Sequence, residues 1–320
     1  MPQRLVILIL LIVISLTFSC VFPTSSDISD LFEDSEFELL IREALEIPEG
    51  EITAEDMLTI TKLDGSRRGI KNISGIEYCV NLTELELRSN AYLDVVKLDI
   101  SLISDLKNLT NLKLNRYTIN DISPLSGLTN LAYLELHENQ ISDITPLSGL
   151  TNLTMLYMYR NPISDIFPLS GLTNLTMLIL GSNDIDDIAP LSRLTNLTYL
   201  ELDRNQISDI TPLSGLTNLM KLWLHKNQIS DISPLSDLTN LTLLVLYHNQ
   251  ISDISPLSGL TNLNALDLGD NQVIDIQPLV DNTGIGDRDF VDLYNNPLSD
   301  TSINVYIQQL KDRGVHVNCC

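Results

Sequence analysis

A unit of 22 residues repeats in unbroken register between residues 106 and 281. The copy that runs from Leu194 to Gly215 reads LTNLTYLELDRNQISDITPLSG. The eight copies begin at Leu106, Leu128, Leu150, Leu172, Leu194, Leu216, Leu238 and Leu260. A unit this short cannot bury its own apolar side, so it must stack on copies of itself. The repeat therefore predicts an elongated solenoid with one continuous core.

Three leucines in each copy define the side that is buried. Leu197, Leu200 and Leu202 follow the pattern L-x-x-L-x-L, in which the last two alternate as residues of a strand do. The residues predicted to point outward are Tyr199, Glu201 and Asp203. On this pattern the unit is identified as a leucine-rich repeat. We therefore expect an α/β fold, a right-handed horseshoe with a parallel sheet on its concave face and helical caps at both ends.

An asparagine follows each strand and is expected to turn the chain. Resemblance to leucine-rich repeats implies that its amide is buried and bonds backbone groups of adjacent coils, which otherwise would lie unpaired. This ladder consists of Asn139, Asn161, Asn183, Asn205, Asn227, Asn249 and Asn271, with Asn90 further upstream. Tyr117 interrupts it once.

The second half of the repeat returns along the convex side. Ile207 and Ile210 are predicted to be buried, and Thr211 and Pro212 resemble an N-cap and a first helical residue. The cap position holds Ser or Thr in five of the eight copies, with Phe167, Ala189 and Gln277 as the departures. So few residues remain for the outer segment that a short 3₁₀ turn or loop fits better than an α-helix.

The N-terminal residues read as an export signal. Arg4 precedes the apolar stretch 5–18, which ends at Thr17-Phe18-Ser19-Cys20, and this ending resembles a bacterial lipobox with Cys20 as the lipidated residue. Ordinary cleavage with secretion and a retained anchor are the alternatives. The predicted boundaries are 1–20 signal peptide, 21–30 polar tether, 31–62 acidic helical cap, 63–105 degenerate repeats, 106–281 eight regular repeats, and 282–320 last degenerate repeat and helical cap.

Both caps show helix signals. Asp34 or Ser35 can begin a helix that runs to about Glu46, and Thr53 with Asp56 resembles a capping box. At the other end, residues 301–313 read as a helix that stops at Gly314. The helix faces predicted to be apolar are Phe37, Leu40, Ile41 and Leu45 at the first end, and Ile303, Tyr306, Ile307 and Leu310 at the second. Cys79 is expected to be a small buried hydrophobe, and a five-residue surplus is expected to bulge over residues 92–97.

Composition and motifs argue against several classes of function. The chain holds 42 acidic and 19 basic residues, so phosphate backbones would repel it and nucleic acid is not an expected partner. We find no motif for a nucleophile, a phosphate loop or a zinc site, and predict no enzyme, no cofactor and no metal. The aspartate of the recurrent Ser-Asp-Ile is assigned to architecture, because an active site needs one distinctive place rather than many identical ones.

The outward strand positions differ from copy to copy and carry the functional information. Most of those between residues 128 and 259 are aromatic or apolar, although the inward leucines already fill the core. A contiguous exposed apolar patch usually marks a partner site. The predicted ligand-binding residues are Tyr133, Met155, Tyr157, Tyr159, Met177, Ile179, Tyr199, Glu201, Lys221, Trp223, His225, Val245 and Tyr247. The alternative is that these residues suit strands and stack for stability.

The wording L-x-x-L-x-L-x-x-N-x-I-x-D-I-x-P-L resembles the internalin-like class of bacterial leucine-rich repeat proteins over about residues 57–300. Internalins continue into an immunoglobulin-like module and a wall-sorting signal, so membrane-tethered display is expected to replace wall attachment here. The leading hypothesis is a monomeric, exported, non-enzymatic binding module for a protein, with a glycan as the other ligand, anchored to the bacterial envelope through Cys20 or secreted. The alternatives are a self-associating envelope protein and an intracellular scaffold or phosphatase regulator.

Overall fold

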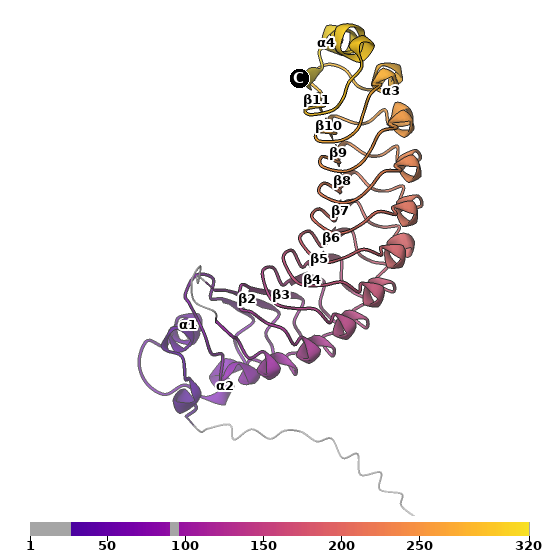
Figure 1. The fold of residues 1–320 in the computed structure, drawn as a ribbon. Helices are drawn as coiled ribbons and strands as arrows, with labels where there is room; N and C mark the ends of the chain where they lie inside the picture. Colours follow the sequence, from indigo (N-terminus) through magenta and orange to yellow (C-terminus); the bar gives the residue numbers. More distant parts are fainter. Residues whose placement is uncertain (1–26, 90–95, 320) are drawn as a thin grey trace, which may run out of the picture.

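The computed structural model describes residues 27–89 and 96–319. In these residues twelve strands form one parallel sheet, ordered from β1 to β12 as in the sequence. The coils stack along an arc, with the strands on its inner side and short helical turns on its outer side (Figure 1). The predicted horseshoe of leucine-rich repeats is thereby confirmed. The predictions for the signal peptide, Cys20, residues 21–26 of the tether, Asn90 and residues 92–95 of the bulge concern positions outside the described residues.

The strands are short, because each repeat contributes only a few residues to the sheet. They are β1 (Lys62–Asp64), β2 (Glu84–Arg88), β3 (Asn111–Asn115), β4 (Tyr133–Glu135), β5 (Met155–Tyr157), β6 (Met177–Ile179), β7 (Tyr199–Glu201), β8 (Lys221–Trp223), β9 (Leu243–Val245), β10 (Ala265–Asp267), β11 (Phe290–Asp292) and β12 (His316–Asn318). The inward leucines fill the core as predicted: Leu197, Leu200 and Leu202 are all fully buried. The spacing of the apolar residues therefore fixes which face of every strand is inside.

The convex side consists of 3₁₀ turns, as the short outer segment predicted. Before and among the repeats these are η1 (Ser29–Leu31), η2 (Ile76–Tyr78), η3 (Ser101–Ile103), η4 (Ser123–Leu125), η5 (Thr145–Leu147), η6 (Phe167–Leu169), η7 (Ala189–Arg193), η8 (Thr211–Leu213), η9 (Ser233–Leu235) and η10 (Ser255–Gly259). The last regular copy instead carries a short α-helix, α3 (Gln277–Asp281). All eight turns of the regular copies have Pro at their second residue.

The predicted capping role of Thr211 is wrong. The turn begins at Thr211 itself and its hydroxyl accepts no capping bond. The Thr211 N–H donates instead to Asp209 Oδ1 at 2.8 Å. The same bond recurs in all eight copies, from the aspartate of Ser-Asp-Ile or its equivalent to the N–H two residues on. A carboxylate is a stronger acceptor than a hydroxyl, which explains why Phe167, Ala189 and Gln277 can replace Ser or Thr.

The asparagine amides connect each coil to the one before it. Asn205 Oδ1 accepts from Ile185 N at 3.0 Å, and Asn205 Nδ2 donates to Leu180 O at 3.1 Å and to Leu202 O at 3.0 Å. Asn296 in the last degenerate repeat makes the same set of bonds, and we did not assign it from the sequence. Backbone groups that the turn leaves without a strand partner are thus satisfied inside the coil.

The N-terminal cap follows its sequence signals. Helix α1 (Ser35–Leu45) begins after Asp34, whose Oδ1 accepts from Glu36 N and Phe37 N. Helix α2 (Ala54–Met57) begins with the predicted capping box of Thr53 and Asp56. The side chain of Asp34 also joins the cap to the first repeats, because its Oδ2 accepts from Lys71 N at 2.6 Å. Cys79 is fully buried, which raises the pKa of its thiol to about 12 and leaves it protonated.

The C-terminal cap departs from the predicted single α-helix. A π-helical turn, η11 (Ser302–Tyr306), precedes α4 (Ile307–Asp312), and Gly314, the predicted stop, follows the C-cap Arg313 at a φ of 89°. Ser302 is buried and its hydroxyl donates to Ile274 O at 2.9 Å. The wider turn changes which side chains face the core, so Ile303 is 40% exposed, against the prediction, while Leu310 is buried. No helix within residues 27–89 and 96–319 is long and apolar enough to cross a membrane.

Candidate functional site on the concave face

Strand register aligns the outward residues of the concave sheet into columns. The first column runs through Tyr133, Met155, Met177, Tyr199, Lys221 and Leu243, and the middle column through Glu135, Tyr157, Ile179, Glu201, Trp223 and Val245. A third column, just beyond the strands, holds His137, Tyr159, Gly181, Asp203, His225 and Tyr247. All thirteen residues predicted to bind a ligand lie in these columns. Lys221 is exposed and the other twelve are half-buried.

The aromatic side chains of neighbouring strands contact one another. The ring centroids of Tyr133 and Tyr157 are 5.1 Å apart, and those of Tyr199 and Trp223 are 4.5 Å apart. The rings of His225 and Tyr247 are stacked at 4.3 Å. Trp223 is thus less exposed than the sequence suggested, because one of its faces lies against Tyr199. We call this set of side chains over β4–β9 the aromatic band.

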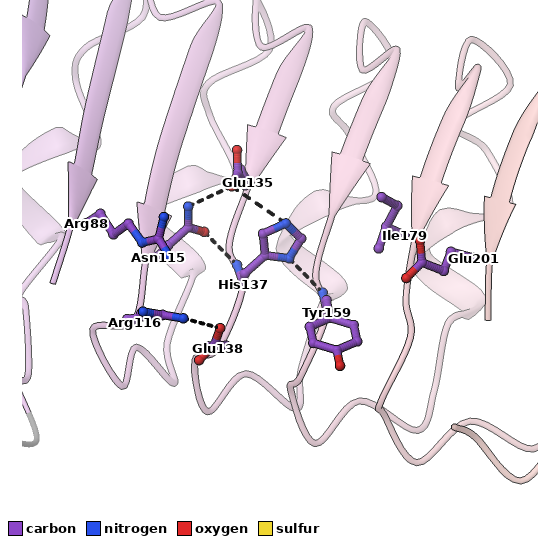
Figure 2. Close-up of a pocket in the computed structure, with 9 residues that line it drawn as sticks. All are labelled: Arg88, Asn115, Arg116, Glu135, His137, Glu138, Tyr159, Ile179 and Glu201. Atoms are coloured by element: carbon purple, nitrogen blue, oxygen red, sulfur yellow. Dashed lines mark hydrogen bonds and ion pairs between the residues drawn. The ribbon is translucent and has the colours of Figure 1, made fainter. Parts of the chain in front are cut away.

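A polar pocket of about 310 Å³ lies beside the N-terminal half of the aromatic band (Figure 2). It is lined by Arg88, Asn115, Arg116, Glu135, His137, Glu138, Tyr159, Ile179 and Glu201. Of these, only Tyr159, Ile179 and Glu201 were predicted to bind a ligand. Arg116 and Glu138 lie at positive φ, at 66° and 53°, just after the strands. The position before the ladder residue is charged in six of the eight copies, with Ser182 and His248 as the departures, and this pattern could have identified them.

Hydrogen bonds hold the pocket's imidazole in place. Asn115 Nδ2 donates to Glu135 Oε1 at 2.8 Å, and Asn115 Oδ1 accepts from His137 N at 2.8 Å. His137 Nδ1 accepts from Tyr159 N at 3.1 Å, so the ring proton is on Nε2, which lies 3.6 Å from Glu135 Oε1. Burial lowers the pKa of His137, against the opposing effects of Glu135 and Glu138. A neutral histidine is therefore fixed at the centre of the wall shown in Figure 2.

Charged side chains form the pocket's rim. Arg116 donates to Glu138 at 2.9 Å, and Arg160 lies 3.9 Å from the other oxygen of Glu138. The Arg160 guanidinium also lies 5.2 Å from the centroid of the Tyr159 ring, within the range of a cation–π contact. Cationic and anionic side chains thus alternate beside the ring of Tyr159. Such a rim can bind a polar or charged group of a ligand.

Asp203, which we predicted to point outward, is buried among its neighbours on the concave side. Its Oδ2 is 3.3 Å from His225 Nε2, and its Oδ1 has no hydrogen-bond partner. The neighbouring coil has Gly181 at this position, and a Cβ there would lie 2.2 Å from Asp203 Oδ1. The carboxylate therefore occupies space that a side chain would fill. Burial, followed by the charge of Asp203, raises the pKa of Glu201 beside it.

The site offers side chains for binding, with no assembled metal centre. Within residues 27–89 and 96–319 no group of three His, Cys, Asp or Glu side chains is placed to hold a metal ion. His225 and His248 lie on neighbouring coils but do not share an environment, since His225 is half-buried on the band and His248 is exposed. What the face presents is a row of aromatic rings, a polar pocket and a charged rim.

Comparisons with known proteins agree with this fold. Residues 107–149, 129–172, 151–193, 173–215, 195–237 and 239–281 match the family described as Leucine Rich repeats (2 copies). An internalin (inlF) from Listeria monocytogenes is 34% identical, with a TM-score of 0.77 over 92% of this chain and 93% of that one. Internalin C2 (inlC2) from the same species is also 34% identical, with a TM-score of 0.58 over 76% and 96%.

A more distant similarity extends to plants. The leucine-rich repeat ectodomain of the receptor kinase GASSHO1/SCHENGEN3 from Arabidopsis thaliana, in complex with Casparian strip integrity factor 2, is 19% identical. Its TM-score is 0.63 over 77% of this chain and 33% of that one. At this identity the likeness concerns the fold alone. A search of curated proteins finds no match.

Proposed function

Because this chain belongs to the internalin-like bacterial leucine-rich repeat proteins, we propose that it is an exported, non-enzymatic module that binds a protein on its concave face. The observation that carries this proposal is the aromatic band. Its rings lie outward over β4–β9, while the leucines of the same strands fill the core. Tyrosine and tryptophan concentrate binding energy in protein interfaces.

The polar pocket complements the band. Interfaces combine an apolar centre with a polar rim, and the pocket adds arginine, glutamate and histidine side chains beside the rings. The plant receptor ectodomain supports the proposal in one respect, since a solenoid of this fold is found there in complex with another molecule. A glycan is the second class of ligand for the band. Its sugar rings would stack on the tyrosine rings.

Export and anchoring are part of the proposal. The apolar segment 5–18 and the lipobox-like Thr17-Phe18-Ser19-Cys20 support a lipid anchor on Cys20, with secretion as the alternative. We expect Cys20→Ala to release the protein from membranes or to block its processing, because acyl chains contribute about 0.8 kcal/mol per buried CH₂. Intact-mass measurement of the mature protein tests this. An unmodified N-terminus beyond residue 20 would contradict the anchor.

The binding proposal is tested by capture from native envelopes with three proteins. They are the wild type, a double variant Tyr157→Ala and Trp223→Ala, and the control Asp267→Asn, which keeps the oxygen that accepts from Gly269 N. We expect the wild type and the control to retain the same envelope component and the double variant to lose it. Equal retention by all three would contradict binding on the band. Concentration-dependent sedimentation of the wild type alone would favour the self-associating envelope protein.

A further inference from the structure

The convex side of the solenoid is largely polar and repetitive, but Phe167 interrupts this pattern, as Ile274 does in the last regular copy, where it is 55% exposed. Phe167 begins η6, where the other copies have Ser, Thr, Ala or Gln, and it is 69% exposed. The turn does not need the ring, because Phe167 N donates to Asp165 Oδ1 at 2.8 Å as in every other copy. An isolated exposed apolar side chain is ordinary on a protein surface. What distinguishes this one is its surroundings.

A cleft of about 790 Å³ lies beside Phe167, between η6 and η7. It is lined by Ser164, Asp165, Ile166, Phe167, Ser170, Asp186, Asp187, Ala189, Pro190, Ser192 and Arg193. Ala189 stands where five copies have a hydroxyl side chain, and η7 extends over five residues, to Arg193, where η6 and η8 have three. The sequence of this coil thus differs from its neighbours at the positions that line the cleft.

The charges of the cleft favour a cationic occupant. Asp165 and Asp187 are the turn aspartates, and Asp186 adds a third carboxylate where the other copies have Ser, Asn or Ile. Against these three carboxylates stands one cation, Arg193, so the lining carries a net charge of 1 − 3 = −2. An aromatic face flanked by carboxylates attracts a guanidinium or an ammonium group through both the ring quadrupole and the charges.

The same chain already uses this contact on its other face. The guanidinium of Arg160 lies 5.2 Å from the Tyr159 ring centroid, and Lys226 Nζ lies 5.6 Å from that of Tyr247. Phe167 presents an exposed ring of the same kind to whatever enters the cleft. We propose that the cleft between η6 and η7 is a second binding site, on the convex face, that takes an arginine or lysine side chain of a protein partner. It does not depend on binding at the concave face.

The full chain labelled with 4-fluorophenylalanine provides the test. The chain holds six phenylalanines, and the ¹⁹F signal that disappears in Phe167→Thr, a change that restores a residue of the other copies, is assigned to Phe167. The probe is an acetylated tetra-arginine amide, with tetra-glutamate as the charge control. We expect a saturable shift of the Phe167 signal with tetra-arginine and none with tetra-glutamate. The Phe167→Thr protein should keep the wild-type melting temperature within about 1 °C, because the ring is exposed.

Variants that restore repeat residues make the test specific. Asp186→Ser should weaken the affinity about threefold, since an exposed ion pair contributes modestly, and Arg193→Gly should strengthen it about twofold by removing the competing cation. Asp237→Gly removes one exposed convex carboxylate two coils away and should change nothing. If Asp237→Gly weakened the affinity for tetra-arginine as much as Asp186→Ser does, the binding would be general attraction to an acidic chain, and the proposal would be overturned. A shift with maltohexaose but not with tetra-arginine would indicate a glycan site, and a shift on concentrating the free protein would indicate a second copy.

Discussion

The two faces of the solenoid are built from the same repeat but vary in different ways. On the convex side, the aspartate bond to the turn is present in all eight regular copies with lengths of 2.8 to 2.9 Å. On the concave side, the outward residues change from strand to strand, and they gather rings over β4–β9. Repeated residues therefore maintain the coil, and varied residues are where binding can be sought. The interruption at Phe167 is informative for the same reason.

The largest effect expected from a single polar side chain concerns the asparagine ladder. Asn205→Ala removes bonds to Ile185 N, Leu180 O and Leu202 O, and these buried groups then lack partners. We expect a loss of about 1–3 kcal/mol in the free energy of unfolding. Arg204→Ala, at an exposed neighbouring position, should cost no more than about 0.5 kcal/mol. Urea denaturation compares the two, and equal midpoints would contradict the assignment of the ladder.

Acid should destabilise the turns of the convex side, and the effect of each turn aspartate should be smaller than that of a ladder asparagine. The pKa of Asp209 is lowered because the hydroxyl and the N–H of Thr211 donate to its carboxylate, and Asp143 is lowered in the same way by Thr145. A carboxyl with a lowered folded-state pKa stabilises the fold above its unfolded pKa of about 3.9, and that stabilisation is lost as the pH falls through the folded value.

Replacement of both aspartates by asparagine should therefore flatten the fall in melting temperature below about pH 4, since an amide oxygen still accepts the bond but does not titrate. The control is Asp300→Asn, at an exposed position outside the turns. Thermal melts from pH 7 to pH 2.5 measure the slope. If the double variant and the control lose stability in parallel with the wild type, the turn bonds do not carry the acid sensitivity.

The smallest effect is expected where the sequence suggested a helix cap. Thr211→Ala should change the free energy of unfolding by no more than about 0.5 kcal/mol, because Asp209 Oδ1, and not the hydroxyl, satisfies the turn. Ala189 occupies the equivalent place in another copy with its N–H bonded to Asp187 at 2.8 Å. Denaturation of Thr211→Ala alongside Asp209→Ala provides the check. A larger loss for Thr211→Ala would restore the capping role.

Periodicity explains what could be predicted from the sequence. The leucines, the ladder asparagines and the 3₁₀ turns each depend on contacts that recur every 22 residues, so one copy explains them all. The N-cap at Asp34 and the capping box at Thr53 could likewise be predicted, because a helix cap depends only on residues close to it in the sequence. The sequence did not identify Asp209, rather than Thr211, as the residue that satisfies the turn. Both side chains are polar and both recur, and only the geometry of the turn distinguishes them.

Other features depend on contacts between unlike coils. Asp203 is buried because Gly181, 22 residues earlier, leaves room for its carboxylate. The polar pocket joins side chains from Arg88 to Glu201, which no single copy contains. The exposed Ile303 follows from a π-helical turn that the apolar spacing did not indicate. Such features require the neighbouring coil as well as the repeat.

The central claim is that inward residues maintain the fold while the aromatic band binds, and Leu222 and Trp223 of strand β8 test it side by side. Leu222 is fully buried, and Leu222→Ala should cost about 2–5 kcal/mol of stability.

Trp223 lies on the opposite side of the strand, against Tyr199. Trp223→Ala should cost no more than about 1.5 kcal/mol, the value of an aromatic pair, yet weaken affinity for the captured envelope component at least about tenfold. The decisive measurement is thermal unfolding together with binding for the two variants. Unfolding of Trp223→Ala to the extent of Leu222→Ala, or unchanged affinity in a folded Trp223→Ala protein, would contradict the claim.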